Sequence, residues 1–337
     1  MADIRHIAQL AKVSPATVSR VLNGHPHVSE ATRKRVLSIV EQENYHPNAL
    51  AANLRRQASD TIGYLQFGRP QLADSRMAQA AEKVLFEAGF KTFLCNADGD
   101  EKRVAFYLDE MIGRRVAGMI LCPQGHEGRA FKAAQRLQQA GTATLILSDQ
   151  ASGSGISSVA SDRLQGWLIG FQHLLELGHQ RIAVLGQREV EMPPLPALPE
   201  PIRQLVSAHL VAALQQDVRA LFKSSHSRPS ALFCANEQLT IETARVLDHL
   251  NIQVPQQISL LGFSDTDFGR MIYPSLTSVR LPVEDLGLCC AEQLLTFIRN
   301  SQSPARSVQF EYQLQQGNST ARPVQALQIP FQPLGSA

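Results

Sequence analysis

Short polar side chains and one arginine gather close together near the start of the chain. The polar residues of this set are Ser14, Thr17, Ser19, Asn23 and His27. Groups of this kind hydrogen-bond to phosphate oxygens. Arg20 lies among them, and its planar guanidinium matches the two acceptors on the edge of guanine. Pro15 and Ala16 offer no side-chain hydrogen bond, so contact with a thymine methyl group or with groove shape is expected there.

Three short helices are expected to position these residues. Apolar residues recur at helical spacing over residues 4–11. Ser14 is a good cap for a second helix, in which Val18, Val21 and Leu22 would face inward, and Ser29 is a good cap for a third. A second helix that begins with small residues can place its N-terminal end in the major groove, where the free N–H groups also favour phosphate.

The charge of the chain is unevenly distributed. Residues 1–60 carry eight Lys and Arg against five Asp and Glu, a net charge of +3. The other residues carry 24 against 25, a net charge of −1. A modestly basic head on a nearly neutral body indicates that phosphate contacts are confined to the head.

From Thr61 onward, apolar strand-like runs alternate with amphipathic helical stretches. The expected strands are 61–67, 91–95, 116–122, 143–148, 181–186, 230–235 and 258–263. The expected helices are 75–88, 102–112, 127–139, 163–177 and 237–250. Strand–helix alternation with almost continuously apolar strands is typical of parallel sheets covered on both faces. Seven such units predict two doubly wound lobes, with a cleft that collects the carboxyl ends of strands from both.

The head resembles the DNA-binding head of the lactose-repressor family of bacterial transcription regulators. The matching motifs are Ile4-x-x-Ile7-Ala8, Val13-Ser14, the run from Ala16 to Asn23, Val28-Ser29, Thr32-Arg33, Val36, Tyr45, Pro47-Asn48 and Leu54. The match covers about 55 residues without a gap. It implies a dimer that places two heads on a pseudo-palindromic operator, with Arg20 and its neighbours in the major groove.

The same resemblance implies a hinge helix that forms on operator DNA. Leu54 matches the residue that wedges into the minor groove, and Asn48 and Ala51 match its flanking positions. An apolar wedge unstacks one base step, which costs a few kcal/mol that are offset by contacts on the bent duplex. The segment is too short to be a stable helix alone in water, so small changes in the core could decide whether it folds.

The resemblance continues more weakly through the rest of the chain. The landmarks are Gly63, Arg115 to Gly118, Gly178-His179, Arg181 to Ala183, Val254-Pro255, the run from Ile258 to Phe263, Pro274, the run from Leu276 to Val279, and Leu286-Gly287. The implied core has two lobes of periplasmic-binding-protein type, and the chain crosses between them three times. The first lobe would be 61–157 plus about 281–308, and the second 158–280 plus the tail. The proline-rich stretch 187–205 is interpreted as a loop, and 187–229 as lacking the strand usual in the family.

The effector pocket is where this sequence departs from the family pattern. Two usual carboxylates are replaced, one by Ser148 and one by Ser264, which Asp265 follows. The expected effector-binding residues are Arg69, Ser148, Arg203, Asn236, Glu237 and Asp265. A carbohydrate-like effector, an anionic one held by Arg69 or Arg203, and no effector at all remain open.

Several other classes of function are disfavoured by what the sequence lacks. The five cysteines form no C-x-x-C pair, and no metal motif, P-loop, G-x-G-x-x-G or G-x-S-x-G is present. Neither an enzyme nor a cofactor is therefore expected. No apolar run of about 18 residues and no signal core occur, so we expect a cytoplasmic protein without a membrane partner.

The sequence therefore predicts an all-α helix-turn-helix head on an α/β core of two doubly wound lobes. The expected domains are 1–46 as the DNA-binding head, 47–60 as hinge and linker, 61–325 as the effector-binding and dimerisation core, and 326–337 as the tail. The predicted function is an effector-controlled repressor. The alternatives are an effector-independent regulator and a cytosolic small-molecule binding protein.

Overall fold

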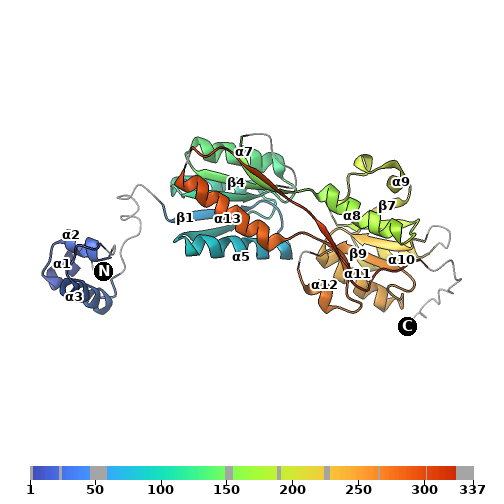
Figure 1. Ribbon diagram of the computed structural model, residues 1–337, viewed down its shortest axis with the longest axis horizontal. Coiled ribbons are helices and arrows are strands. Elements are labelled where there is room, and N and C mark those ends of the chain that lie inside the picture. The colour runs from blue at the N-terminus through green and yellow to red at the C-terminus, as the bar shows by residue number, and fades with distance from the viewer. Residues whose placement is uncertain are drawn as a thin grey trace. The chain divides into compact units, whose positions relative to one another are not determined.

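The computed structural model divides the chain into two compact units, a head (Met1–Ser59) and a core (Asp60–Ala337). Figure 1 shows the helices and strands of both. The structure describes residues 3–22, 25–45, 59–148, 155–187, 191–223, 228–264, 266–300 and 302–323, with the side chain of Ser148 excepted. Each unit has its own hydrophobic interior.

The head is built on three helices with a small apolar centre. These are α1 (Ile4–Ala11), α2 (Pro15–Leu22) and α3 (Glu30–Gln42). The expected caps are present: the Ser14 hydroxyl oxygen accepts from the Thr17 amide at 3.1 Å, and that of Ser29 accepts from the Thr32 amide at 3.4 Å. The fully buried residues are Ile7, Ala8, Ala11, Val18, Val21 and Val36. Of the positions predicted to face inward on α2, Val18 and Val21 are buried, whereas Leu22 is half-buried against the same cluster.

The first lobe of the core is a six-stranded sheet in the order β11-β5-β4-β3-β1-β2, with all neighbours parallel. Its strands are β1 (Thr61–Gln66), β2 (Lys91–Asn96), β3 (Gly118–Cys122), β4 (Ala143–Ser148), β5 (Ser157–Ser161) and β11 (Ser307–Phe310). Its helices are α5 (Leu72–Glu87), α6 (Glu101–Gly113), α7 (Glu127–Gln139) and α13 (Val283–Arg299). Helices α5 and α13 pack in one apolar cluster, and α6 and α7 pack in another, so both faces of the sheet are covered.

The second lobe is a six-stranded sheet in the order β12-β10-β9-β8-β6-β7, parallel except for β12. Its strands are β6 (Ile182–Gly186), β7 (Val206–Leu210), β8 (Ala231–Cys234), β9 (Ser259–Phe263), β10 (Thr277–Arg280) and β12 (Gln313–Gln315). Its helices are α8 (Arg163–Glu176), α9 (Glu200–Arg203), α10 (Leu214–Leu221), α11 (Glu237–His249) and α12 (Phe268–Met271), with a 3-10 turn η2 at Leu195–Ala197. The fold class predicted from strand–helix alternation is confirmed.

The chain passes between the lobes three times, between β5 and α8, between β10 and α13, and between β11 and β12. The first and third crossings lie a few residues later than predicted. Ser157–Ser161 adds a strand beside β4, and Ser307–Phe310 adds an edge strand beside β5, so both belong to the first lobe. The crossings place both sheets around one cleft.

Two further expectations about the second lobe and its neighbour need correction. A strand does occur in the stretch thought to lack one: β7 pairs with β6 in parallel from Val206 to Leu210. It is an edge strand with mostly exposed side chains, so its apolar pattern is weak. Helix α13 was not expected, yet it packs closely on α5. Gly287 makes this possible, because a Cβ there would overlap the Met77 carbonyl.

Candidate nucleic-acid interface and interlobe cleft

The N-terminal half of α2 forms an exposed polar face on the head. Ser14, Pro15, Ala16 and Arg20 are exposed, and Thr17 and Ser19 are half-buried. The Ser14 and Thr17 hydroxyls lie 2.9 Å apart, so the start of the helix is braced by a side-chain pair as well as by its cap. Because Val18 and Val21 anchor the opposite face, this arrangement holds the small residues and Arg20 outward.

The turn after α2 is tied to α3. Arg33 donates from its guanidinium to the His25 carbonyl at 2.5 Å, which fixes the turn that carries the exposed His27. The helix dipole places partial positive charge at the start of α2, which favours phosphate oxygens there. The predicted contacts Asn23, Asn48, Ala51 and Leu54 lie outside the described residues.

A cleft of about 850 Å³ lies between the two lobes, with an adjoining pocket of about 350 Å³. Volumes of this size hold ligands from a monosaccharide upward. Both lobes and all three crossings contribute to its walls. It forms beyond the carboxyl ends of the parallel strands, which is where open α/β sheets bind ligands.

The first lobe lines the cleft with a fixed carboxylate. Asp74, in the first turn of α5, accepts from the Gln71 amide at 2.7 Å and from Gln124 Nε2 at 2.7 Å. Gln124 follows β3, so a strand end and a helix start converge on one carboxylate. Burial, with the nearby Cys122 thiol, raises the pKa of Tyr64, which therefore stays a neutral phenol behind this wall.

The second lobe contributes another buried carboxylate. Glu237, at the start of α11, accepts from the Ser264 hydroxyl at 2.5 Å and from the Thr266 hydroxyl at 2.6 Å. Asn236 caps α11 by accepting from the Leu239 amide at 2.8 Å. Ser264 stands where the family pattern has an acid, so here the acid is supplied by α11 and the hydroxyl by the end of β9.

Aromatic rings form the floor of the cleft on the side of the second lobe. Trp167 and Tyr312 line it, and Phe263 joins them from beneath, its ring centroid 4.9 Å from that of Trp167 and 5.6 Å from that of Tyr312. Arg163 lies over Phe263, 4.6 Å from the ring centroid, and donates to the Ala235 carbonyl at 2.6 Å. Among the described residues, Arg163 Nε and Trp167 Nε1 are buried without a hydrogen-bond partner, and both side chains line the cleft.

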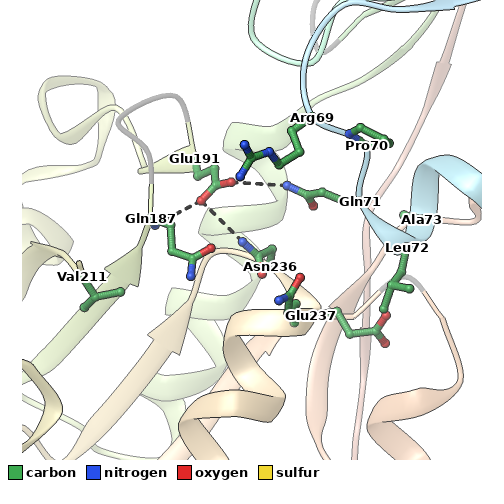
Figure 2. Close-up of a pocket in the computed structure, with 11 residues that line it drawn as sticks. Arg69, Pro70, Gln71, Leu72, Ala73, Gln187, Glu191, Val211, Asn236 and Glu237 are labelled. Atoms are coloured by element: carbon green, nitrogen blue, oxygen red, sulfur yellow. Dashed lines mark hydrogen bonds between the residues drawn. The ribbon is translucent and has the colours of Figure 1, made fainter. Parts of the chain in front are cut away.

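A third carboxylate joins the two lobes across the smaller pocket. Glu191 is 5% exposed and comes from the proline-rich stretch after β6. It accepts from Gln71 Nε2 at 3.3 Å on the first lobe, and from the Gln187 amide at 3.1 Å and Asn236 Nδ2 at 3.4 Å on the second. Figure 2 shows all three contacts converging on one side chain, with Arg69 pointing toward it.

An exposed ion network also crosses between the lobes. Arg76 on α5 lies 3.7 Å from Asp267 of the second lobe and 3.2 Å from Glu284 of α13. Arg280 donates to Asp267 at 3.1 Å and is the main reason that the pKa of this carboxyl is lowered. Exposed pairs of this kind contribute little to stability, so the buried bridge at Glu191 is the more significant interlobe contact.

The predicted effector residues are only partly brought together. Arg69, Asn236 and Glu237 line the smaller pocket. Arg203 lies on α9, paired with the neighbouring Glu200, and is not among the residues that line the cleft. Ser148 ends β4 with its side chain outside the description, and Asp265 lies outside the described residues.

Sequence reasoning missed many of the residues that line the cleft, among them the polar residues Gln71, Gln124, Arg163 and Glu191. Each lies just beyond a strand, at the start of a helix or at a crossing, so the rule that ligands bind at strand ends could have found them. Among the described residues, no group of His, Cys, Asp or Glu could hold a metal ion. No helix in the described part of the chain is long and apolar enough to span a membrane.

Comparison with known families separates the head from the core, as the fold does. Residues 3–48 match "Bacterial regulatory proteins, lacI family". Residues 75–192 match "Periplasmic binding proteins and sugar binding domain of LacI family", and residues 171–320 match "Periplasmic binding protein-like domain".

Curated relatives align over almost the whole chain. The ribose operon repressor of Escherichia coli (strain K12) is 29% identical over 315 residues, which cover 88% of this chain and 92% of the relative. The HTH-type transcriptional repressor PurR of Aliivibrio fischeri (strain ATCC 700601 / ES114) is 29% identical over 333 residues, which cover 91% and 94%.

Solved structures share the fold. The lac repressor dimer bound to operator and the anti-inducer ONPF has a TM-score of 0.76 at 22% identity, covering 95% of this chain and 99% of that one. A LacI family transcriptional regulator from Enterococcus faecium with bound ribose has a TM-score of 0.66 at 26% identity, covering 78% and 99%.

Proposed function

The chain belongs to the lacI family of bacterial regulatory proteins, and we propose that it is a DNA-binding transcriptional repressor controlled by a small molecule in its interlobe cleft. The observation that carries this proposal is the outward face of α2, where Ser14, Pro15, Ala16, Thr17 and Arg20 stand on a buried apolar base. A helix of this kind fits the major groove, and Arg20 is the residue with the reach and geometry to read a guanine.

We assign residues 1–46 to DNA binding, 47–60 to the hinge, 61–325 to effector binding and dimerisation, and 326–337 to the tail. In this scheme Leu54, flanked by Asn48 and Ala51, inserts at the centre of the operator. Two heads are needed for such an insertion, because each subunit supplies one leucine to the same base step.

An exposed apolar edge on the first lobe supports a homodimer. Strand β2 is an edge strand, and its Phe93 and Leu94 are 46% and 62% exposed. Phe86 on the adjacent α5 is 70% exposed. Apolar edge strands invite association unless they are covered. A second copy of the chain would cover this edge and supply the two-fold symmetry of a pseudo-palindromic operator.

The cleft favours a carbohydrate-like effector over an anionic one. Its fixed acceptors are the carboxylates of Asp74 and Glu237, and hydroxyl groups are the natural donors to them. The aromatic floor would stack on the apolar face of a sugar. The relatives fit this class, since one is named for the ribose operon and one structure holds ribose.

We propose no catalytic role and a cytoplasmic location. The described residues that line the cleft include no histidine or lysine that could act as a general base. Cys122 Sγ contacts Asp74 Oδ1 at 3.9 Å, but that carboxylate already accepts from Gln71 and Gln124. A regulator without an effector is the second candidate, and the occupation of the smaller pocket by Glu191 is the observation that favours it.

The experiment that tests the proposal compares specific and random DNA at one salt concentration. An operator is first selected from random duplexes with the purified chain, and binding is then measured by fluorescence anisotropy. Arg20→Ala should weaken operator binding by about 1–3 kcal/mol for each half-site more than it weakens binding to random duplex, because only the operator loses the contact with a base. Arg35→Ala removes the same charge from an exposed site on α3, and should weaken both duplexes equally. Equal affinity of the unaltered chain for operator and random duplex would sink the proposal.

A further inference from the structure

Residues 191–203, which end with α9, form a strap that is packed into the core, so this part of the stretch interpreted from the sequence as a loop is not a free loop. Leu198 and Ile202 are buried, and Met192 and Leu195 pack against the same apolar cluster as Trp167 and Phe233. Five prolines fall between Met192 and Ile202, and each fixes its own φ angle. A strap with so little conformational freedom loses little entropy when it holds one side chain in place.

The strap is fitted closely at its first residues. A Cβ on Gly186, the last residue of β6, would overlap the Met192 sulfur. Met192 therefore lies directly against the end of the strand, and Glu191 beside it is directed into the pocket between the lobes. The position of Glu191 follows from packing on both sides.

Glu191 occupies hydrogen-bond donors that a ligand would use. One carboxylate oxygen accepts from Gln71 on the first lobe, and the other accepts from Asn236 and from the Gln187 amide on the second. Gln71 and Asn236 start α5 and α11, and both line the pocket. A single buried carboxylate thus makes the contacts between lobes that a bound small molecule makes in a two-lobed binding protein.

We propose that Glu191 is an internal ligand of the cleft. It bridges the lobes when no small molecule is bound, and an effector acts by competing for the same three N–H groups. This proposal rests on the repressor function given above, and it specifies how the site is regulated. The competing molecule is one that presents hydrogen-bond-accepting hydroxyl oxygens, as a carbohydrate does, to Gln71 and Asn236 at once.

The proposal is tested by removing the Glu191 carboxylate and then supplying a carboxylate from solution. In Glu191→Ala the full-length chain should become more open by small-angle X-ray scattering, and the fluorescence of Trp167, the only tryptophan, should shift because this ring lines the cleft. Operator affinity should change by about fivefold or more, the range typical of coupling between sites. Sodium acetate, against sodium chloride at matched ionic strength, should restore the closed state of this variant and leave the unaltered chain as it was.

Two further variants keep the test decisive. Gln71→Ala removes the first-lobe donor from an exposed position, so the fold should survive; it should open the chain as Glu191→Ala does, without rescue by acetate. Glu200→Ala is the matched control, since it removes an exposed carboxylate from the same strap. It should leave scattering and fluorescence unchanged.

The inference is overturned if Glu191→Ala and Gln71→Ala both scatter and fluoresce like the unaltered chain. It is equally overturned if acetate affects all variants alike. Its failure is distinguishable from failure of the repressor function. If the chain binds operator but neither substitution changes its scattering or fluorescence, the repressor function stands and the internal-ligand proposal fails. The scattering measurement does not depend on operator binding, so it tests the internal ligand whether or not operator is recognised.

Discussion

Replacement of Phe233 by alanine should remove much of the stability of the second lobe. Phe233 is fully buried on β8, and its ring centroid lies 4.4 Å from that of Trp167, 5.4 Å from that of Phe171 and 5.5 Å from that of Phe263. A buried Phe→Ala change costs about 3–5 kcal/mol. Contacts with three aromatic neighbours, each contributing about 0.5–1.5 kcal/mol beyond burial, place the expected loss at about 4–5 kcal/mol.

The cavity left by this change cannot be filled by its nearest neighbour. Gly170 on α8 faces the Phe233 ring so closely that a Cβ would overlap it, and glycine has no side chain to move into the space. Gly170→Ala alone should therefore destabilise the core. In the Phe233→Ala background the same change should stabilise it, because the added methyl partly fills the cavity and alanine favours the helix by about 1 kcal/mol over glycine.

Thermal unfolding followed by Trp167 fluorescence and calorimetry measures both effects. A shift of about 2–3 °C per kcal/mol in a domain of this size predicts that the Tm of Phe233→Ala falls by about 8–15 °C. Phe106→Ala is the matched control, since that ring is 61% exposed on α6, and it should shift the Tm by at most a few degrees. A loss under about 1 kcal/mol for Phe233→Ala, or the same sign for Gly170→Ala in both backgrounds, would refute the packing described here.

Two further predictions concern pH and assembly. Burial lowers the pKa of His179, whose ring donates from Nε2 to the Ala321 carbonyl at 3.0 Å. The unfolded chain therefore binds a proton at this ring more readily than the folded chain does. The contribution of His179 to the stability of the fold is complete above the unfolded pKa near 6.5, and it is lost as the pH falls below that value. The Tm of the unaltered chain should drop more steeply between pH 7.5 and 5.5 than that of His179→Gln, and parallel curves would contradict this reasoning. Leu94→Lys places a charge on the exposed edge strand β2, and should convert the dimer to monomer in sedimentation velocity without lowering the Tm of the isolated subunit. A dimer of unchanged affinity would place the interface elsewhere.

The head was almost fully predictable from its residues. Its helices depend on neighbours three and four positions away, and its caps Ser14 and Ser29 lie next to the helices they start. The outward position of Arg20 follows from the inward positions of Val18 and Val21 on the same short helix. Local spacing therefore carried both the fold of the head and its candidate interface.

The central strands of the core were also predictable, whereas its edges were not. Strands such as Ile182–Gly186 are apolar throughout because both faces are covered, and that composition is visible in one dimension. The edge strand Val206–Leu210 has mostly exposed side chains, so only its pairing with β6 makes it a strand. The predicted lobe limits were a few residues too early for the same reason, because only pairing with neighbouring strands makes β5 and β11 strands of the first lobe.

The amino-acid sequence by itself determined the periodic elements, the two doubly wound lobes and the outward face of α2, because each depends on residues close together in the chain. Only the tertiary structure decided the composition of the cleft. Gln71 and Glu191 are 120 residues apart and meet because two lobes and a proline-rich strap converge on one pocket. Glu237 likewise replaces the acid missing at Ser264 only once α11 packs beside the end of β9. Contacts made across such separations leave no periodic pattern, so no local reading of the residues could contain them.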